Sequence, residues 1–191
     1  MPTRAEIQAT LGSSVTHVLA FFRGLSPDDL ERNATASAVP GAAPWRAKDH
    51  FAHLVNSERN IHRLLRRALA GEPRDVLLRM QYPEAMPMPG TLGDWEALTR
   101  EEQERLEMAV ATVNETYVTA HRDDSIETIA AEYLAARQDT LGILQQFTDD
   151  RLAGPVPTVV CDQSASELFI GRASHATDHI TWIQEGFRRG V

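Results

Sequence analysis

Cysteine is almost absent from this chain of 191 residues, because Cys161 is the only one. A lone cysteine cannot close a disulfide within the chain, so core burial must hold the fold, and we expect a cytoplasmic location. No apolar run approaches the roughly 18 residues that a transmembrane helix needs, and the polar first residues lack a signal peptide's apolar segment. The sequence therefore predicts no membrane partner.

Positive charge is also scarce. The chain has 19 Lys and Arg against 27 Asp and Glu, a formal net charge of −8 and a pI near 5.3. An acidic chain repels phosphate backbones, and Arg63, Arg66 and Arg67 resemble a solvated face near a helix C-terminus, where cations are favoured. We therefore expect no nucleic-acid partner.

The remaining composition is ordinary for a globular protein, with 42% hydrophobic and 24% charged residues. A chain of this length can bury one sizeable core, so we predict a single domain spanning residues 1–191. A homodimer that associates through helix faces is the expected oligomeric state.

Five amphipathic segments with capping residues at their starts predict an all-α fold. The four principal helices are expected near residues 4–24, 46–70, 125–148 and 165–188. A fifth, near 100–121, is expected to be a flanking helix with Leu106, Val110, Val113 and Tyr117 inward and charged residues outward.

Three connections contain enough proline and glycine to predict loops. Residues 33–44 are expected to form an ordered loop without strand character, and residues 153–163 a short extended piece but no sheet. Residues 71–98 are expected to be mostly loop, and loops this long are commonly functional. Their Met80, Tyr82, Met86 and Met88 either close over a pocket as a lid or pack loosely on the helices.

A pair of histidines in the last helix is the strongest chemical signal. His175 and His179 are four residues apart, so both rings lie on one side of a helix and can reach one metal ion. They flank an apolar seam that includes Ala176, Ile180 and Ile183. The alternative is that both are hydrogen-bonded boundary residues, because the chain has seven histidines in all.

The second predicted helix offers a third ligand, either His53 beside its apolar seam or His50 one turn earlier. The two histidine-bearing helices also occur in similar surroundings. Each follows a helix, an Asp-Asp turn at Asp29 or Asp150, and a proline-containing loop. This order predicts either two related helix pairs that bring the histidine helices together, or merely common turn chemistry.

In these two helices the chain resembles the DinB/YfiT-like superfamily. Trp45, Asp49, His53, Leu54 and Glu58 match its W-x3-D-x3-H-L-x3-E pattern, and His175 and His179 match its H-x3-H pattern. The resemblance covers nearly the whole chain and implies a four-helix bundle, here with an additional helix and long loops. It also implies a divalent ion, nickel, zinc or iron, bound by His53, His175 and His179.

Members of that superfamily include thiol-dependent S-transferases, a maleylpyruvate isomerase and metal-dependent hydrolases. The resemblance therefore implies an enzyme that activates a low-molecular-weight thiol or water against a small electrophile. A non-catalytic binding module with a structural or vestigial metal is the alternative, although a structural zinc site normally has four protein ligands.

Two acidic residues are candidates to support the ligands. Asp49 lies one turn before His53 and could orient its ring. Glu58 could do the same, or could pair with Arg137, which also interrupts an apolar seam. Two other mechanisms are excluded. A zinc-protease helix would carry Glu where Ala176 stands, and Cys161 has no activating group nearby in sequence.

Overall fold

The computed structural model describes residues 2–81, 95–159 and 161–190, and these residues are mostly helical. The long helices are α1 (Arg4–Gly24), α3 (Ala47–Leu69), α5 (Arg100–Ala120), α6 (Ile126–Leu144) and α8 (Ala165–Arg189). The short ones are α2 (Pro27–Glu31), α4 (Arg74–Arg79), the 3-10 turn η1 (Trp95–Ala97) and α7 (Asp149–Ala153). The predicted all-α class is confirmed. None of the helices in the described ranges has the apolar length that crossing a bilayer requires.

The helix starts follow the local capping chemistry of the sequence. Thr3, Thr99 and Ser164 each accept a hydrogen bond from the backbone N–H three residues later, and the glutamate at that position accepts one in return. Ser125 caps α6 through the N–H of Thr128. Helix α6 ends at Leu144, about one turn before the predicted end near residue 148, and Thr148 instead caps α7.

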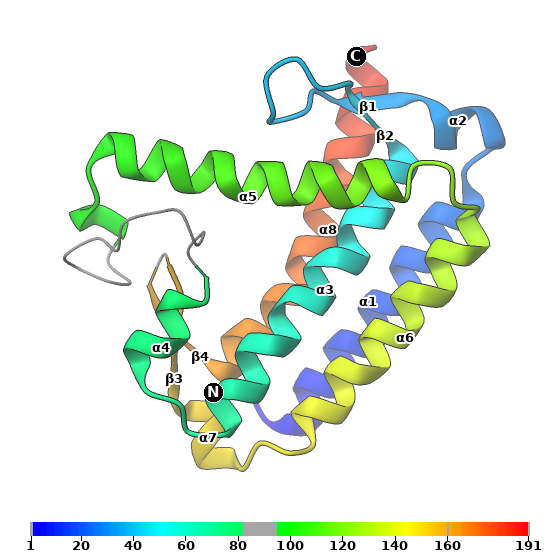
Figure 1. Ribbon diagram of the computed structural model, residues 1–191. Coiled ribbons are helices and arrows are strands. Elements are labelled where there is room, and N and C mark those ends of the chain that lie inside the picture. The colour runs from blue at the N-terminus through cyan, green and yellow to red at the C-terminus, as the bar shows by residue number, and fades with distance from the viewer. Residues whose placement is uncertain (1, 82–94, 160, 191) are drawn as a thin grey trace.

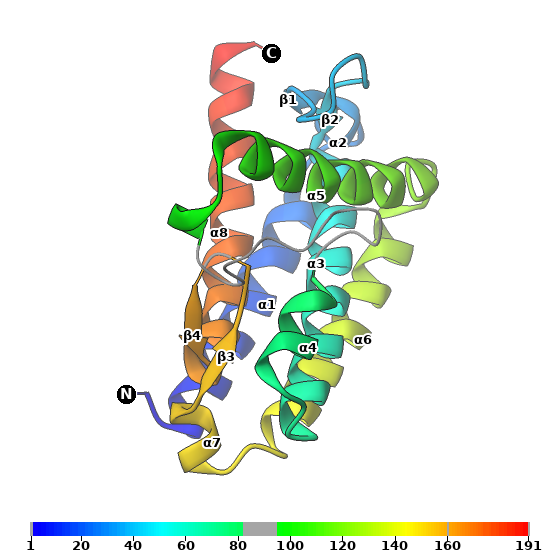
Figure 2. The same ribbon diagram turned by 60° about the vertical axis from the view of Figure 1, so that its left-hand side comes forward.

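Four long helices, α1, α3, α6 and α8, lie side by side (Figure 1). Helix α3 packs on α6 and α1 packs on α8, while contacts of α1 with α6 and of α3 with α8 complete the arrangement. Helix α5 crosses this group at a steep angle and packs on α3 (Figure 2). The expected flanking position of this fifth helix is confirmed.

The prediction that Val110 and Val113, in the middle of α5, face inward is wrong. Leu106 and Val118 are buried near its two ends, but Val110 and Val113 are 52% and 57% exposed. A helix that crosses its neighbours steeply contacts them over a short length, so an apolar seam cannot stay covered along all of it.

The order of elements repeats along the chain. The first half is α1-α2-β1-β2-α3 and the second is α6-α7-β3-β4-α8, with α4, η1 and α5 between them. The small β-pairs lie at opposite ends of the helix group in both views (Figures 1 and 2). The prediction that the two histidine-bearing helices come together is confirmed, because α3 contacts α8.

The predicted absence of strands in the connections is wrong. Strand β1 (Asn33–Thr35) pairs antiparallel with β2 (Trp45–Arg46), and β3 (Pro155–Pro157) with β4 (Asp162–Ser164). Strands of two or three residues are too short to show alternating hydrophobicity in the sequence. The β3–β4 turn is closed by local bonds, such as that from Thr158 Oγ1 to the Cys161 carbonyl, 2.6 Å.

The expected loop at 71–98 also contains a short helix, α4, whose Leu77 and Leu78 are buried. Pro73 stands at its N-cap, so the proline that predicted a loop instead precedes a helix. Of the residues expected to form a lid, Met80 packs against the core, and residues 82–94 lie outside the described part of the chain.

The core has two large apolar clusters separated by a buried polar layer, and a small third cluster contains Leu98 and Leu106. One cluster includes the stacked rings of Phe22 and Phe51, whose centroids are 4.3 Å apart, and the other includes Phe169. Between them along α3 and α6 lie Glu58 and Arg137, which form an ion pair of 2.9 Å. The alternative predicted from the sequence, that Glu58 pairs with Arg137, is confirmed.

Candidate metal centre

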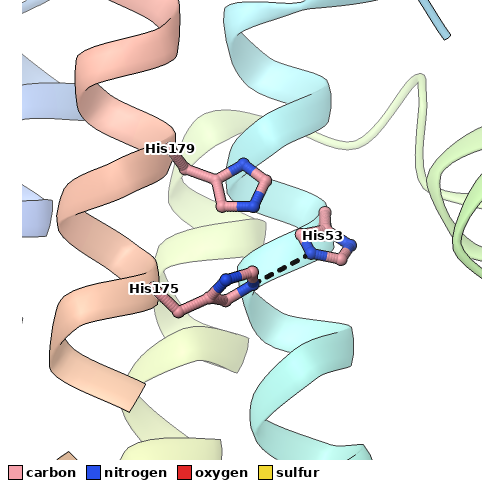
Figure 3. A group of neighbouring side chains, drawn as sticks. All are labelled: His53, His175 and His179. Carbon is pink, nitrogen blue, oxygen red and sulfur yellow. Dashed lines mark hydrogen bonds between the residues drawn. The ribbon is translucent and has the colours of Figure 1, made fainter. Parts of the chain in front are cut away.

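The histidines of the two motifs converge where α3 and α8 run past each other in opposite directions. His53 extends from α3 toward His175 and His179 of α8 (Figure 3). One ring nitrogen from each lies within 4.8 Å of the other two. The Nε2 atoms of His53 and His175 are 3.1 Å apart, close to the roughly 3 Å expected between neighbouring nitrogens that each lie about 2.1 Å from one ion.

Burial keeps these rings neutral. His53 and His179 are 7% and 3% exposed, whereas His175 is partly open. Desolvation lowers the pKa of His53 to about 3 and that of His175 to about 4, with further lowering from the charge of Arg172. The pKa of His179 is lowered still more strongly by the same burial. Neutral imidazole is the form that binds metals, so the three rings are suitable ligands at pH 7.

His50 has a different position from the three converging rings. Its Nδ1 lies 2.7 Å from Nδ1 of His179, and its Nε2 lies 3.1 Å from Oγ1 of Thr35. The ring is 1% exposed, and burial lowers its pKa to about 4. This contact occupies Nδ1 of His179 and leaves its Nε2 for a ligand. His50, considered from the sequence as a competing ligand, is therefore placed to orient His179.

The prediction that Asp49 orients the ring of His53 is wrong. Its carboxylate accepts hydrogen bonds from the Arg46 backbone N–H at 2.8 Å and from the guanidinium groups of Arg46 and Arg122 at 2.9 and 3.2 Å. Within the described residues, Nδ1 of His53 is buried without a hydrogen-bond partner. Asp49 instead joins the start of α3 to the residues that follow α5.

Glu58 is likewise engaged elsewhere. One carboxylate oxygen pairs with Arg137, and the other accepts a hydrogen bond of 2.6 Å from Thr140. The Thr140 hydroxyl also lies 2.7 Å from Nε2 of His62. Glu58 therefore belongs to the polar layer of the core, and the proposed support of His53 by its carboxylate is not observed.

Two tryptophans border the histidines. The ring of Trp45 lies 5.4 Å from that of His50 and 5.3 Å from that of His53, and its Nε1 donates to Glu115 of α5 at 2.7 Å. Trp182 lies 4.6 Å from His179 and is 43% exposed. Aromatic rings therefore pack against the histidines on two sides, and Trp182 is partly exposed to solvent.

Other features of the described chain are less suited to chemistry. A cavity of about 400 Å³ is lined by Val39 and α5 residues that include Glu115, whose carboxylate is already hydrogen-bonded. The thiol of Cys161 is exposed. The three histidines form the one metal-suited group found among the described residues.

No protein-family model, curated protein or solved structure matches this chain. The fit to a metal therefore rests on the donor set itself. Three neutral imidazoles from two helices can hold one divalent ion, and within the described part of the chain no fourth histidine, cysteine or carboxylate completes the group. This donor set fits an ion that keeps coordination positions open.

Proposed function

We propose that this chain is a DinB-like helical bundle in which His53, His175 and His179 bind one divalent ion, nickel, zinc or iron. The observation that carries the proposal is the convergence of these rings from α3 and α8 to within 4.8 Å. Because His53 is distant in sequence from His175 and His179, only the folded chain brings the three rings together. The arrangement of α1, α3, α6 and α8 supports the bundle assignment.

We further propose that the site activates a nucleophile against a small electrophile. A divalent ion held there would lower the pKa of a coordinated thiol or water and so supply the reactive anion at neutral pH. The protein holds the ligands in place through the contact of His50 with His179, and Trp45 limits water around His53.

A thiol-dependent transferase is the preferred activity, and a metal-dependent hydrolase would use the same residues with water. A non-catalytic module with a structural ion is the remaining alternative. The three-ligand site favours an enzyme, because structural zinc sites are normally closed by four protein ligands.

The test is to assay metal-loaded protein with a panel of electrophiles and several low-molecular-weight thiols, and separately with esters and amides. We expect turnover that needs the thiol and is lost in His179→Ala. Thiol-independent ester or amide cleavage would assign a hydrolase. No turnover on either panel, with metal bound in stoichiometric amount, would favour the non-catalytic module.

A further inference from the structure

The histidines belong to a longer row of side-chain pairs that joins α3 to α8. His179 meets His50 at 2.7 Å, His175 meets His53 at 3.1 Å, and one turn further Arg172 donates to Ser57 at 2.9 Å. The helices are antiparallel, so as the residue number decreases along α8 the number of its partner on α3 increases. Arg172 is therefore the next side chain in the row after His175.

Arg172 carries a charge that the surrounding protein does not pair. Its Nη1 donates to Ser57, its Nε is enclosed without a partner, and within the described residues no carboxylate forms an ion pair with it. Burial lowers the pKa of Arg172 and the charge of Glu58 raises it, but the two oxygens of Glu58 are already bound by Arg137 and Thr140. The Arg172 guanidinium in turn lowers the pKa of His53 and His175, so it stands beside the cluster.

The guanidinium of Arg172 is half-buried and has donors left for an anion. Partly withdrawing a cation from water without a salt bridge costs free energy that a bound anion would recover. Guanidinium has five N–H donors in a planar fork, of which the protein uses one here. One guanidinium matches the single charge and two parallel oxygens of a carboxylate.

We propose that Arg172 is an anion subsite next to the three histidines, and that the substrate of this centre is an electrophile that carries a carboxylate. Calling the bound molecule a substrate rests on the proposed function, but the anion subsite itself requires only Arg172. Residues three apart on a helix have Cβ atoms about 5–6 Å apart, so one small molecule can contact Arg172 and reach the ligand nitrogens.

The test is calorimetric titration of metal-loaded protein with trans-cinnamate and with its neutral isostere trans-cinnamamide, without thiol, so that turnover is not needed. Because a hydrogen-bonded charge pair is worth about tenfold or more in affinity, we expect cinnamate to bind at least about tenfold more tightly. Arg172→Gln should abolish this preference without changing the affinity for the amide, and Arg172→Lys should keep only part of it. Arg188→Gln removes the same charge from the exposed end of α8 and should retain the preference.

Repeating the titration on metal-free protein separates the two proposals. Cinnamate binding that depends on Arg172 without metal would support the subsite even if the metal proposal fails. Equal affinities for cinnamate and cinnamamide in the unmodified protein would overturn the subsite while leaving metal binding intact. A preference that survives in folded Arg172→Gln, as judged by circular dichroism, would also overturn it, because the anion would then bind elsewhere.

Discussion

At the scale of single residues, the account depends on which nitrogen of each histidine is free. A neutral imidazole has one donor and one acceptor nitrogen, so a contact at Nδ1 fixes what Nε2 can do. His50 makes that contact with His179 and is itself held by Thr35. The candidate site therefore consists of three histidines that could bind a metal and a fourth that is placed to orient one of them.

His50→Gln tests this division of roles. We expect it to weaken metal affinity by about 10–100-fold, the usual effect of losing a group that orients a ligand, while one ion per chain still binds at saturating metal. Competition with a chelator of known affinity measures the change. Thr35→Val should produce a smaller loss of the same sign, and an unaltered affinity in His50→Gln would contradict the orienting role.

The buried histidines also make the stability of the metal-free protein depend on pH. Their pKa values are lowered to about 4 for His50 and about 3 for His53, below the unperturbed value of about 6.5. Below pH 6.5 the unfolded chain therefore binds more protons than the folded one, and protonation favours unfolding. The free energy of unfolding should fall as pH decreases from about 6.5 toward 4, by up to about 1.4 kcal/mol per pH unit for each such histidine.

Urea unfolding of metal-free protein at a series of pH values measures this slope. His50→Gln removes one titrating group and should make the slope shallower by about one proton. If the variant and the unmodified protein lose stability in parallel between pH 6.5 and 4, His50 is not held neutral in the folded state.

The three histidines that converge could be predicted from the sequence, but their surroundings could not. The spacing of His175 and His179 and the resemblance around His53 identified the three rings that converge. Asp49 is paired locally with Arg46, three residues earlier, but its second cation, Arg122, is 26% exposed and distant in sequence, so no local pattern indicates that contact. The contact of His50 with His179 of α8 could not be predicted for the same reason.

At the scale of elements, the long helices follow from capping residues and apolar periodicity, which are local. The short strands and α4 depend on pairing and burial that only the folded chain supplies. Strand β1, for example, packs over α8. At this contact a Cβ placed on Gly186 would lie 1.8 Å from the carbonyl oxygen of Ala34, so the close approach of helix and strand requires glycine.

Gly186→Ala should therefore destabilise the protein by about 1–3 kcal/mol, the usual cost of overpacking, because a backbone atom cannot move aside as a side chain can. Gly142→Ala is the matched control. Gly142 is an exposed glycine inside α6 with open space around it, so alanine should stabilise by about 0.5–1 kcal/mol. Thermal unfolding of both variants checks the prediction, and a neutral Gly186→Ala would show that α8 and β1 are not in contact.

At the scale of the whole molecule, the candidate centre joins two halves with the same order of elements. Helix α3, which ends the first half, supplies His53, and α8, which ends the second, supplies His175 and His179. The order of turns and histidine-bearing helices in the sequence indicated this relation. The steep crossing of α5 and the exposure of Val110 and Val113 were not predictable, because helix packing angles leave no mark on a single helix's periodicity.

The most direct test of the central claim is the metal content of the purified protein, measured by mass spectrometry beside its histidine variants. We expect one divalent ion per chain in the unmodified protein and almost none in His53→Ala, with the same loss in His175→Ala and His179→Ala. His17→Ala is the matched control, because His17 lies on α1 away from the cluster, and it should retain the ion. Full metal content in all three ligand variants, or none in the unmodified protein supplied with nickel, zinc and iron, would contradict the account.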